Sequence, residues 1–335
     1  MVSARKQPLR LVLGVIVLSY LALLLGFLSV LALDWPQTGW LGFLRELTLY
    51  LFLPVPFLIA GALLLRAWES LALALLPALL FAYWYGTQLV PLPHGSSGAS
   101  RFRAMTFNVG GQHGGGQLEP LLRAIRAERA DLITLQEVPA ATLEALVPAL
   151  LTDYPYQIGT LDTMTISRFP LLDVEEFRLQ ADGYVCQRMD VVIEDQLITL
   201  FNVHVRRPTS GVDLWHTWLP WASRYGVDWR DTQVTALLGL IREVDGPLLV
   251  MGDFNQTEWS SSYSRLTTEL QDGFRATGSG FGHTYPSHWG PWNIRLPLLR
   301  IDYIFHSAEL VASRAHVGPD GGSYHLPTVA DLAFR

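Results

Sequence analysis

The long apolar runs of this chain are confined to its first 90 residues, and this uneven distribution constrains the fold more than any other feature. Leu11–Leu33 is a 23-residue stretch without a charged side chain, long enough for a helix to cross a hydrocarbon core of about 30 Å. Leu47–Leu65 and Leu71–Val90 are a second and a third apolar segment. Their prolines fit this interpretation, since membrane helices tolerate proline. We therefore predict three transmembrane helices that anchor the chain in a lipid bilayer.

The flanking charges predict how these helices are oriented. Arg5, Lys6 and Arg10 precede the first segment and Arg66 lies between the second and third. Because loops rich in Lys and Arg stay in the cytoplasm, three crossings place the rest of the chain outside the cytoplasm. Two crossings would reverse this orientation. A cleaved signal peptide is the competing interpretation of the first segment, but the segment is long for a signal core and no Ala-x-Ala site follows.

The remainder of the chain has the composition of an ordinary globular domain. Residues 91–100, rich in Pro, Gly and Ser, predict a flexible linker between a membrane region at 1–90 and a domain at 101–335. Removing the five basic and three acidic residues before residue 101 from the totals of 24 and 30 leaves 19 and 27, a net charge of −8. This acidity argues against a protein that grips long nucleic acids through many phosphates. The single cysteine, Cys186, excludes an intrachain disulfide.

Apolar stretches with strand and helix periodicity alternate through residues 101–335, which predicts an α/β fold with two sheets covered by helices. The expected helices are 118–129, 141–151 and 231–244, the last with an N-cap at Asp228 or Asp231. The expected strands are 102–109, 131–136, 164–167, 184–193, 197–203, 248–251, 301–305 and 328–334.

Polar side chains follow or end these apolar strands repeatedly. All are carboxylates, amides or imidazoles: Asn108, Gln136, Glu137, Asn202, His204, Asp253, Asn255, Asp302 and His325. A single polar residue at a strand end is usually a loop residue, but such a series is unusual. Carboxylate oxygens bind Mg²⁺ and imidazoles transfer protons, so the series predicts a site for a divalent cation and a phosphate.

The segments that carry these residues resemble the endonuclease/exonuclease/phosphatase superfamily. The matching pieces, in the family's order, are TFNV, LQEV, SRFP, NVH, GDFN, RIDYIF and a final S-x-H-x-P, and they span the domain from about residue 101 to the end. The resemblance implies a four-layer α/β sandwich with the site at one rim of two packed sheets. It also implies a metal-dependent phosphoesterase that cleaves phosphodiester or phosphomonoester bonds with Mg²⁺ or Mn²⁺.

The resemblance also implies individual roles. Glu137 is expected to be the main metal ligand, with Asn108 beside the same ion. Asp253 is expected to activate the attacking water, and Asn255 to contact the phosphate or hold that water's partners. His204 and His325 are expected to contact the phosphate, and Asp302 to fix the tautomer of His325. Asn202 is as consistent with a structural role as with a catalytic one.

Three further features leave alternatives open. Arg206 and Arg207 follow His204 and are candidates for gripping a substrate phosphate. The aromatic stretch Trp215–Trp229 is either a loop folded on its own domain or a surface for membrane or substrate. Tyr324 stands where the family usually has Asp before its last histidine, which leaves open weaker metal binding, strict one-metal chemistry, another substrate or lost activity.

The leading hypothesis is therefore a multi-pass protein of the cell membrane whose extracytoplasmic domain hydrolyses a phosphate ester. Nucleic acid, a phospholipid headgroup or a small phosphoester all remain as substrates, and the sequence implies no obligate protein partner. The alternative is a non-catalytic membrane receptor or scaffold that retains the fold. Its only support is Tyr324, because the other site residues of the family pattern are all present.

Overall fold

The chain folds into two compact units. The computed structural model describes residues 2–33, 38–89, 101–110, 118–160, 162–208, 225–288 and 294–335. The first unit comprises Met1–Val90 together with Thr209–Gly226, and the second comprises Pro91–Pro208 together with Val227–Arg335. The expected linker at 91–100 and most of the aromatic stretch Trp215–Trp229 lie outside the described residues.

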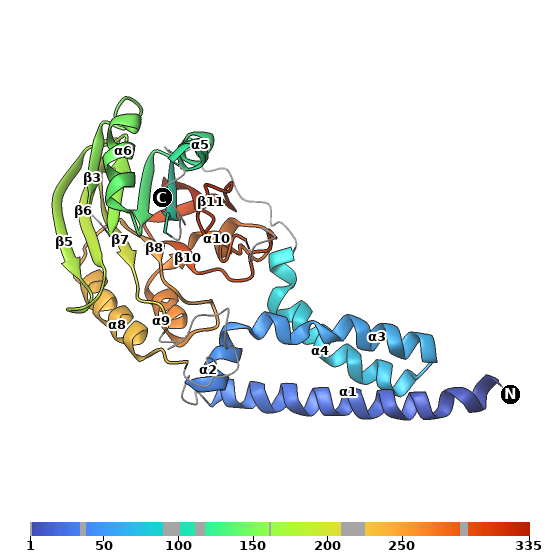
Figure 1. The fold of residues 1–335 in the computed structure, drawn as a ribbon. Helices are drawn as coiled ribbons and strands as arrows, with labels where there is room; N and C mark the ends of the chain where they lie inside the picture. The colour runs from blue at the N-terminus through green and yellow to red at the C-terminus, as the bar shows by residue number, and fades with distance from the viewer. Residues whose placement is uncertain are drawn as a thin grey trace. The chain divides into compact units, whose positions relative to one another are not determined.

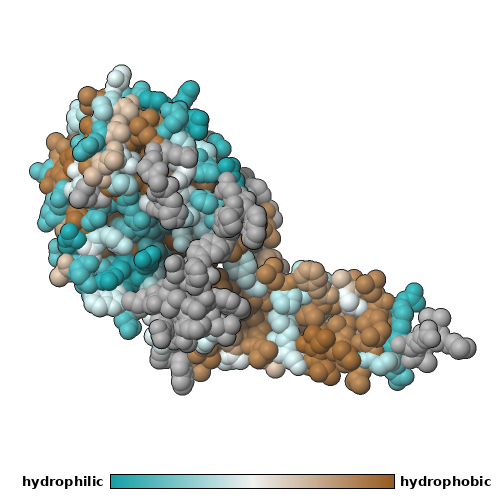
Figure 2. Space-filling view, in the orientation of Figure 1, coloured by the Kyte–Doolittle hydropathy of each residue, from teal (hydrophilic) through white to brown (hydrophobic). Residues whose placement is uncertain are grey.

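The first unit contains the apolar helices. Its elements are α1 (Val2–Ala32), α2 (Gly39–Glu46), the 3₁₀ helix η1 (Thr48–Phe52), α3 (Pro54–Leu65) and α4 (Trp68–Leu89). Three segments of the described chain are long and apolar enough to cross a membrane, at Lys6–Ala32, Thr48–Leu65 and Trp68–Leu89. Figure 2 shows that apolar residues cover these helices, as expected for helices that are hydrophobic all round.

The basic beginning of α1 lies against the end of α3. Arg10 Nε donates to the carbonyl oxygen of Leu65 at 2.8 Å, and Lys6 Nζ to that of Leu64 at 3.4 Å. Carbonyl groups at the end of a helix lack intrahelical partners and attract cations, which explains this contact. Helices α1 and α3 are therefore antiparallel, and Lys6 and Arg10 lie at the same end of the helical unit as Arg66, which follows α3.

The second unit is built on two six-stranded mixed sheets (Figure 1). The first has the strand order β11-β12-β1-β2-β4-β3, with bounds β1 (Arg101–Asn108), β2 (Leu132–Gln136), β3 (Tyr156–Gly159), β4 (Thr163–Ser167), β11 (Leu310–Val317) and β12 (Thr328–Phe334). The second has the order β5-β6-β7-β8-β10-β9, with bounds β5 (Leu171–Arg178), β6 (Val185–Ile193), β7 (Gln196–His204), β8 (Leu248–Asp253), β9 (Gln271–Asp272) and β10 (Asp302–His306).

Helices cover the outer face of each sheet, so the unit has four layers. Helices α5 (Leu118–Glu128) and α6 (Ala140–Leu150) share a buried apolar cluster with the first sheet. Helices α8 (Asp228–Arg242) and α9 (Ser261–Glu269) do the same with the second sheet. A third cluster, which includes the short helix α10 (Gly273–Thr277), lies between the sheets. The expected four-layer α/β sandwich behind three apolar helices is confirmed.

The sequence-based elements differ from the structure in two respects. The expected N-cap of α8 is wrong, because the cap is Val227 without a side-chain hydrogen bond, and Asp228 and Asp231 lie in the first turn. There they face the positive end of the helix dipole instead of capping it. The expected elements also omit β3, β5, β9, β11, α9 and α10. Strand β5 escapes notice because its residues are largely exposed and charged, as is usual for an edge strand.

Candidate active site

One face of each central strand points between the two sheets, and toward one end of the sandwich that face changes from apolar to polar. On β1, Phe102 and Ala104 belong to the inter-sheet core, and Thr106 and Asn108 continue the same face. The same change places six further polar side chains on this face: Gln136 of β2, Gln187 of β6, Asn202 and His204 of β7, Asp253 of β8 and Asp302 of β10. The polar strand ends noted in the sequence therefore meet.

A buried amide network links the two sheets below the site. Gln136 Nε2 donates to Asn202 Oδ1 at 2.9 Å, and Asn202 Nδ2 donates to the carbonyl oxygen of Met164 at 3.1 Å. Thr165 Oγ1 donates to Gln187 Oε1 at 2.8 Å. Buried polar groups are stable only when hydrogen-bonded, and this network satisfies that condition. Its contacts give Asn202 a structural role.

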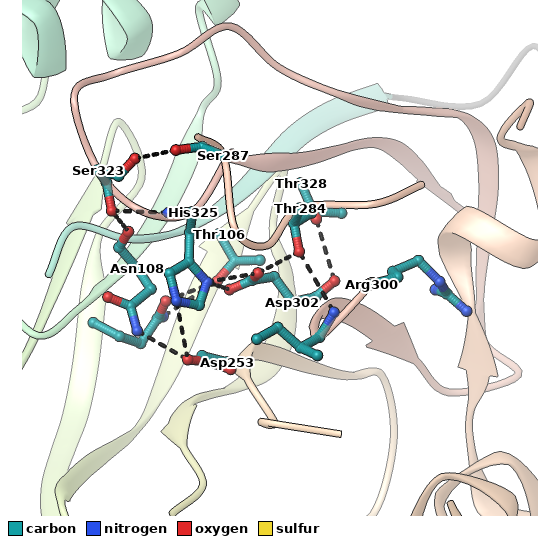
Figure 3. A network of polar contacts seen from close by, with 12 residues as sticks. Thr106, Asn108, Asp253, Thr284, Ser287, Arg300, Asp302, Ser323, His325 and Thr328 are labelled. Atoms are coloured by element: carbon teal, nitrogen blue, oxygen red, sulfur yellow. Dashed lines mark hydrogen bonds and ion pairs between the residues drawn. The ribbon is translucent and has the colours of Figure 1, made fainter. Parts of the chain in front are cut away.

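Asp253 contacts both Asn108 and His325 (Figure 3). Its Oδ2 accepts from Asn108 Nδ2 at 2.9 Å and from Asn255 Nδ2 at 3.2 Å, and its Oδ1 accepts from the backbone N–H of Asn255 at 2.8 Å. Burial and the nearby carboxylate of Asp302 raise the pKa of Asp253 to about 7. A carboxylate with a pKa near neutrality is suited to accept a proton from water.

Close backbone packing fixes the strand that carries Asp253. A Cβ atom at Gly252 would lie 1.8 Å from the carbonyl oxygen of Val203 on the adjacent strand β7, and Gly252 has a φ of +153°. Only glycine allows this approach. The glycine of the GDFN motif therefore brings Asp253 beside His204, its partner in the β7–β8 register.

His325 and Asp302 form a buried pair on the other side of Asp253. Because a carboxylate can only accept, His325 Nδ1 donates to Asp302 Oδ2 at 2.9 Å, and Thr284 Oγ1 donates to the same oxygen at 2.5 Å. His325 Nε2 then faces Asp253 Oδ2 at 3.8 Å. Burial disfavours the charged imidazole, but the carboxylates of Asp302 and Asp253 outweigh it and raise the pKa of His325 to about 9.

His204 is buried beside the same carboxylates. Its Nε2 lies 3.5 Å from Glu137 Oε1 and 3.7 Å from Asp253 Oδ2. Neither ring nitrogen has a hydrogen-bond partner among the described residues, although only 1% of the side chain is exposed. Burial, together with His325 and Arg207, lowers the pKa of His204 to about 3, so the ring is neutral. A neutral imidazole carries one N–H for a further acceptor.

Glu137 provides a carboxylate that reaches solvent. It follows β2 with a φ of +52°, its side chain is 42% exposed, and its Oε1 lies 3.3 Å from Asn108 Nδ2. A Cβ atom at Gly110 would lie 1.9 Å from Glu137 Oε2, so the missing side chain of Gly110 makes room for this carboxylate. An accessible carboxylate fits a hard divalent cation such as Mg²⁺, whereas Asn108 directs its Nδ2 toward this carboxylate and its Oδ1 toward the Gly110 N–H.

Asp253, Asp302 and His325 also offer ligand atoms within 4.8 Å of one another. His325 Nδ1, however, donates its proton to Asp302, which is the geometry of a proton-transfer pair. Of the two groups of potential ligands, Glu137 with Asn108 is the one that reaches solvent.

The two arginines after His204 have different environments. Arg206 Nη1 pairs with Asp182 at 2.6 Å, and its guanidinium lies 5.0 Å from the ring centroid of Trp229. Arg207 is exposed, and none of the described residues forms an ion pair or hydrogen bond with its side chain. Of the two, Arg207 is therefore the one whose side chain remains available for a substrate phosphate.

Tyr324 does not displace His325 from the site. The Tyr324 ring stacks on His288 with 5.0 Å between centroids, and its carbonyl oxygen accepts from the Ser287 N–H at 2.6 Å. Ser323 Oγ contacts the Asn108 carbonyl oxygen at 2.7 Å, which ties this loop to the end of β1. His325 therefore keeps its pairing with Asp302 although the preceding residue is not an acid.

The structure adds site residues that the sequence did not single out. Thr284 Oγ1 donates a hydrogen bond to Asp302, and Ser323 Oγ donates one to the carbonyl oxygen of Asn108. The ring centroids of Tyr285 and His325 are 4.8 Å apart, and the missing side chain of Gly110 leaves room for Glu137. All of them contact the site across long separations in the chain. Only Ser323, as part of the S-x-H-x-P motif, carried a sequence signal.

Comparisons with known proteins identify the family and the fold. The profile of the "Endonuclease/Exonuclease/phosphatase family" matches residues 105–325. No curated protein sequence matches the chain.

Solved structures with the same fold include three whose superposition covers 70% of this chain. They are an endonuclease/exonuclease/phosphatase from Bacteroides vulgatus (18% identity, TM-score 0.56, 100% of that chain), a mannosyl-6-phosphatase from Bacteroides thetaiotaomicron (18%, 0.55, 100%) and truncated TDP2 from Caenorhabditis elegans (18%, 0.53, 98%). At these identities the likeness is one of fold.

Proposed function

This chain belongs to the endonuclease/exonuclease/phosphatase family of phosphoesterase hydrolases, and from this premise we propose that it is a membrane-anchored, Mg²⁺- or Mn²⁺-dependent phosphoesterase. The observation that carries the proposal is the convergence on Asp253 Oδ2, which accepts from Asn108 and Asn255 and faces the imidazoles of His204 and His325. A scaffold without catalytic function would have no need to bury such a costly carboxylate among these groups.

Each of these residues has a separate role in the proposed hydrolysis of a phosphate ester. Asp253 takes a proton from the attacking water, whose oxygen forms the new bond to phosphorus as the ester P–O bond breaks. The neutral ring of His204 donates to a phosphate oxygen, on which charge grows in the transition state. His325, protonated, is held by Asp302 with its Nε2 3.8 Å from Asp253 Oδ2, and this Nε2–H would donate to a phosphate oxygen or to the departing oxygen.

The metal is assigned to the exposed carboxylate. Glu137 would hold the ion through its carboxylate and Asn108 through its amide oxygen Oδ1, and Asn255 would keep Asp253 oriented. Bound Mg²⁺ supplies positive charge to the phosphate oxygens and so favours attack by an oxygen nucleophile. Tyr324 adds no carboxylate, which favours one-metal chemistry over a two-metal site.

The first test is phosphodiester turnover by the full chain in detergent micelles. With bis-p-nitrophenyl phosphate we expect release of p-nitrophenol that requires Mg²⁺ or Mn²⁺ and stops with EDTA. p-Nitrophenyl phosphate, DNA and phospholipid vesicles as parallel substrates distinguish monoester, nuclease and lipid preferences. A chain that turns over none of them with either metal would favour the receptor or scaffold alternative.

We also propose that the second unit, the catalytic unit, lies outside the cytoplasm. The antiparallel arrangement of α1 and α3 places Lys6, Arg10 and Arg66 at one end of the helical unit, and three crossings would bring Leu89, the end of α4, to the opposite end. Loops rich in basic residues remain cytoplasmic, which assigns that basic end to the inside.

The orientation is testable in intact cells with two variants that each carry one added cysteine. Glu175 on β5 and Glu69 on α4 are both exposed, and the native Cys186 is fully buried. A membrane-impermeant maleimide is expected to label Glu175→Cys in intact cells and Glu69→Cys only after lysis. The reverse pattern would place the catalytic unit in the cytoplasm.

A further inference from the structure

The ring of Tyr184 lies flat on the ring of His204. The two centroids are 3.8 Å apart and the planes differ by 7°. Tyr184 immediately precedes β6, the strand that pairs with β7, and is half-buried. No motif or family resemblance in the sequence pointed to this tyrosine.

His204 lacks the hydrogen bond that usually orients such a ring. The other imidazole of the site, His325, is fixed through its Nδ1 by Asp302. His204 has no hydrogen-bond partner on either nitrogen among the described residues, yet it is buried and its Nε2 edge faces Glu137 and Asp253. Something other than a hydrogen bond must keep the plane of this ring directed at the site.

The backbone around Tyr184 is held firmly enough to serve that purpose. The N–H of Gly183 donates to the carbonyl oxygen of Gln180 at 2.8 Å, and the Arg178 guanidinium donates to the carbonyl oxygen of Gly183. On the other side, the Val185 N–H donates to Asp162 Oδ2 at 3.0 Å. The tyrosine ring is thus presented from a turn that is tied down on both sides.

We propose that Tyr184 is a positioning residue that fixes the plane of His204 by face-to-face stacking, and so aims its N–H at the substrate phosphate. This inference rests on the proposed function. It assigns the effect to the flat face of the ring and not to the phenol hydroxyl. Because a displacement of about 1 Å of a catalytic group can cost about 100-fold in rate, loss of the stack is expected to be costly.

The test compares four variants of the full chain with Mg²⁺ and bis-p-nitrophenyl phosphate. Tyr184→Phe keeps the stacking face, and we expect it to retain the wild-type kcat. Tyr184→Leu removes the face, and we expect kcat to fall about 100-fold with KM little changed, since the lost interaction belongs to the transition state. His204→Ala and the double variant Tyr184→Leu/His204→Ala complete a double-mutant cycle.

The cycle separates positioning from an independent contribution. If Tyr184 acts only through His204, the double variant is no slower than His204→Ala. Losses that multiply in the double variant would overturn the proposal, as would a Tyr184→Phe variant as slow as Tyr184→Leu. Thermal unfolding of each variant reports whether the fold is intact, and Tyr184→Gln replaces Tyr184→Leu if the latter does not fold.

Failure of the proposed function gives a different result. A wild-type chain without turnover would refute the proposed phosphoesterase, and the same variants would then be compared for Mg²⁺-dependent binding of inorganic phosphate by calorimetry. Weaker phosphate binding by Tyr184→Leu, but not by Tyr184→Phe, supports the positioning role. Equal binding by wild type and Tyr184→Leu overturns it.

Discussion

Asp253→Asn is expected to lower kcat by about 10³-fold, within the range for removal of a general base. The amide cannot take a proton from water, and it also disturbs the three hydrogen bonds that Asn108 and Asn255 donate to this side chain. Initial rates with bis-p-nitrophenyl phosphate and saturating Mg²⁺ measure the effect. The matched control is Asp190→Asn on β6, whose carboxylate accepts from Thr199 and lies outside the site, and it should retain wild-type kcat.

Asp253→Asn is also expected to change how the stability of the folded chain depends on pH. The pKa of Asp253 is raised from 3.8 to about 7, so the folded chain retains this proton where the unfolded chain has released it. The stability due to this group is complete below about pH 4 and is lost as the pH rises through about 7. Asparagine has no such dependence. In EDTA, the melting temperature of Asp253→Asn relative to wild type should therefore increase from about pH 4 to about pH 7.

Either measurement alone can contradict the assignment. A variant that keeps its kcat would show that another group takes the proton from water. A difference in melting temperature that is constant across this pH range would show that Asp253 titrates as an ordinary carboxylate. The two outcomes are independent because one reports on the reaction and the other on folding.

Much of the site was predictable because strand periodicity and strand ends are properties of neighbouring residues. An apolar strand that ends in Asn108, Asp253 or His204 places its last side chain on the face defined two and four residues earlier. The register of β7 with β8 then sets His204 opposite Asp253. The fold followed from the same information, since alternating strands and helices specify layers.

Contacts between distant segments were not predictable in this way. The stack of Tyr184 on His204 depends on a turn before β6 that carries no periodicity, and the hydrogen bond from Thr284 to Asp302 joins a loop to the start of β10. Likewise, the buried Arg300 pairs with Asp272 at 2.7 Å, although each residue looks like a surface charge in the sequence. Long-range packing decides these contacts, and local patterns do not encode it.

Two polar elements at the edge of the fold were missed because they lack an apolar pattern. Strand β5 carries exposed acidic residues because its outer edge pairs with no other described strand, and charge protects such an edge. Helix α9 is short and mostly polar, and its signal is the cap Ser260, which accepts from the Tyr263 N–H. Neither element has the apolar pattern on which strand and helix predictions depend.

Glu137→Gln is expected to remove the metal dependence along with most of the activity. The amide keeps the shape of the side chain but loses the charge that holds a divalent cation, so we expect kcat/KM at limiting Mg²⁺ to fall by at least about 100-fold. Assays over a range of Mg²⁺ concentrations measure this loss. Glu144→Gln on α6 removes the same charge at an exposed position away from the site and should behave as wild type.

Thermal unfolding gives a second readout that does not require turnover. A ligand that binds only the folded chain raises its melting temperature, so Mg²⁺ should stabilise the wild type and Glu144→Gln but not Glu137→Gln. If Mg²⁺ still stabilises Glu137→Gln, the ion is held elsewhere, and the remaining cluster of Asp253, Asp302 and His325 becomes its site. The ring nitrogen of His325 that binds the ion would then carry no proton, and His325 could not donate from that atom. The Glu137→Gln result therefore decides which residues bind the metal. Either Glu137 binds it and Asp253, Asp302 and His325 transfer protons, or these three residues bind it themselves.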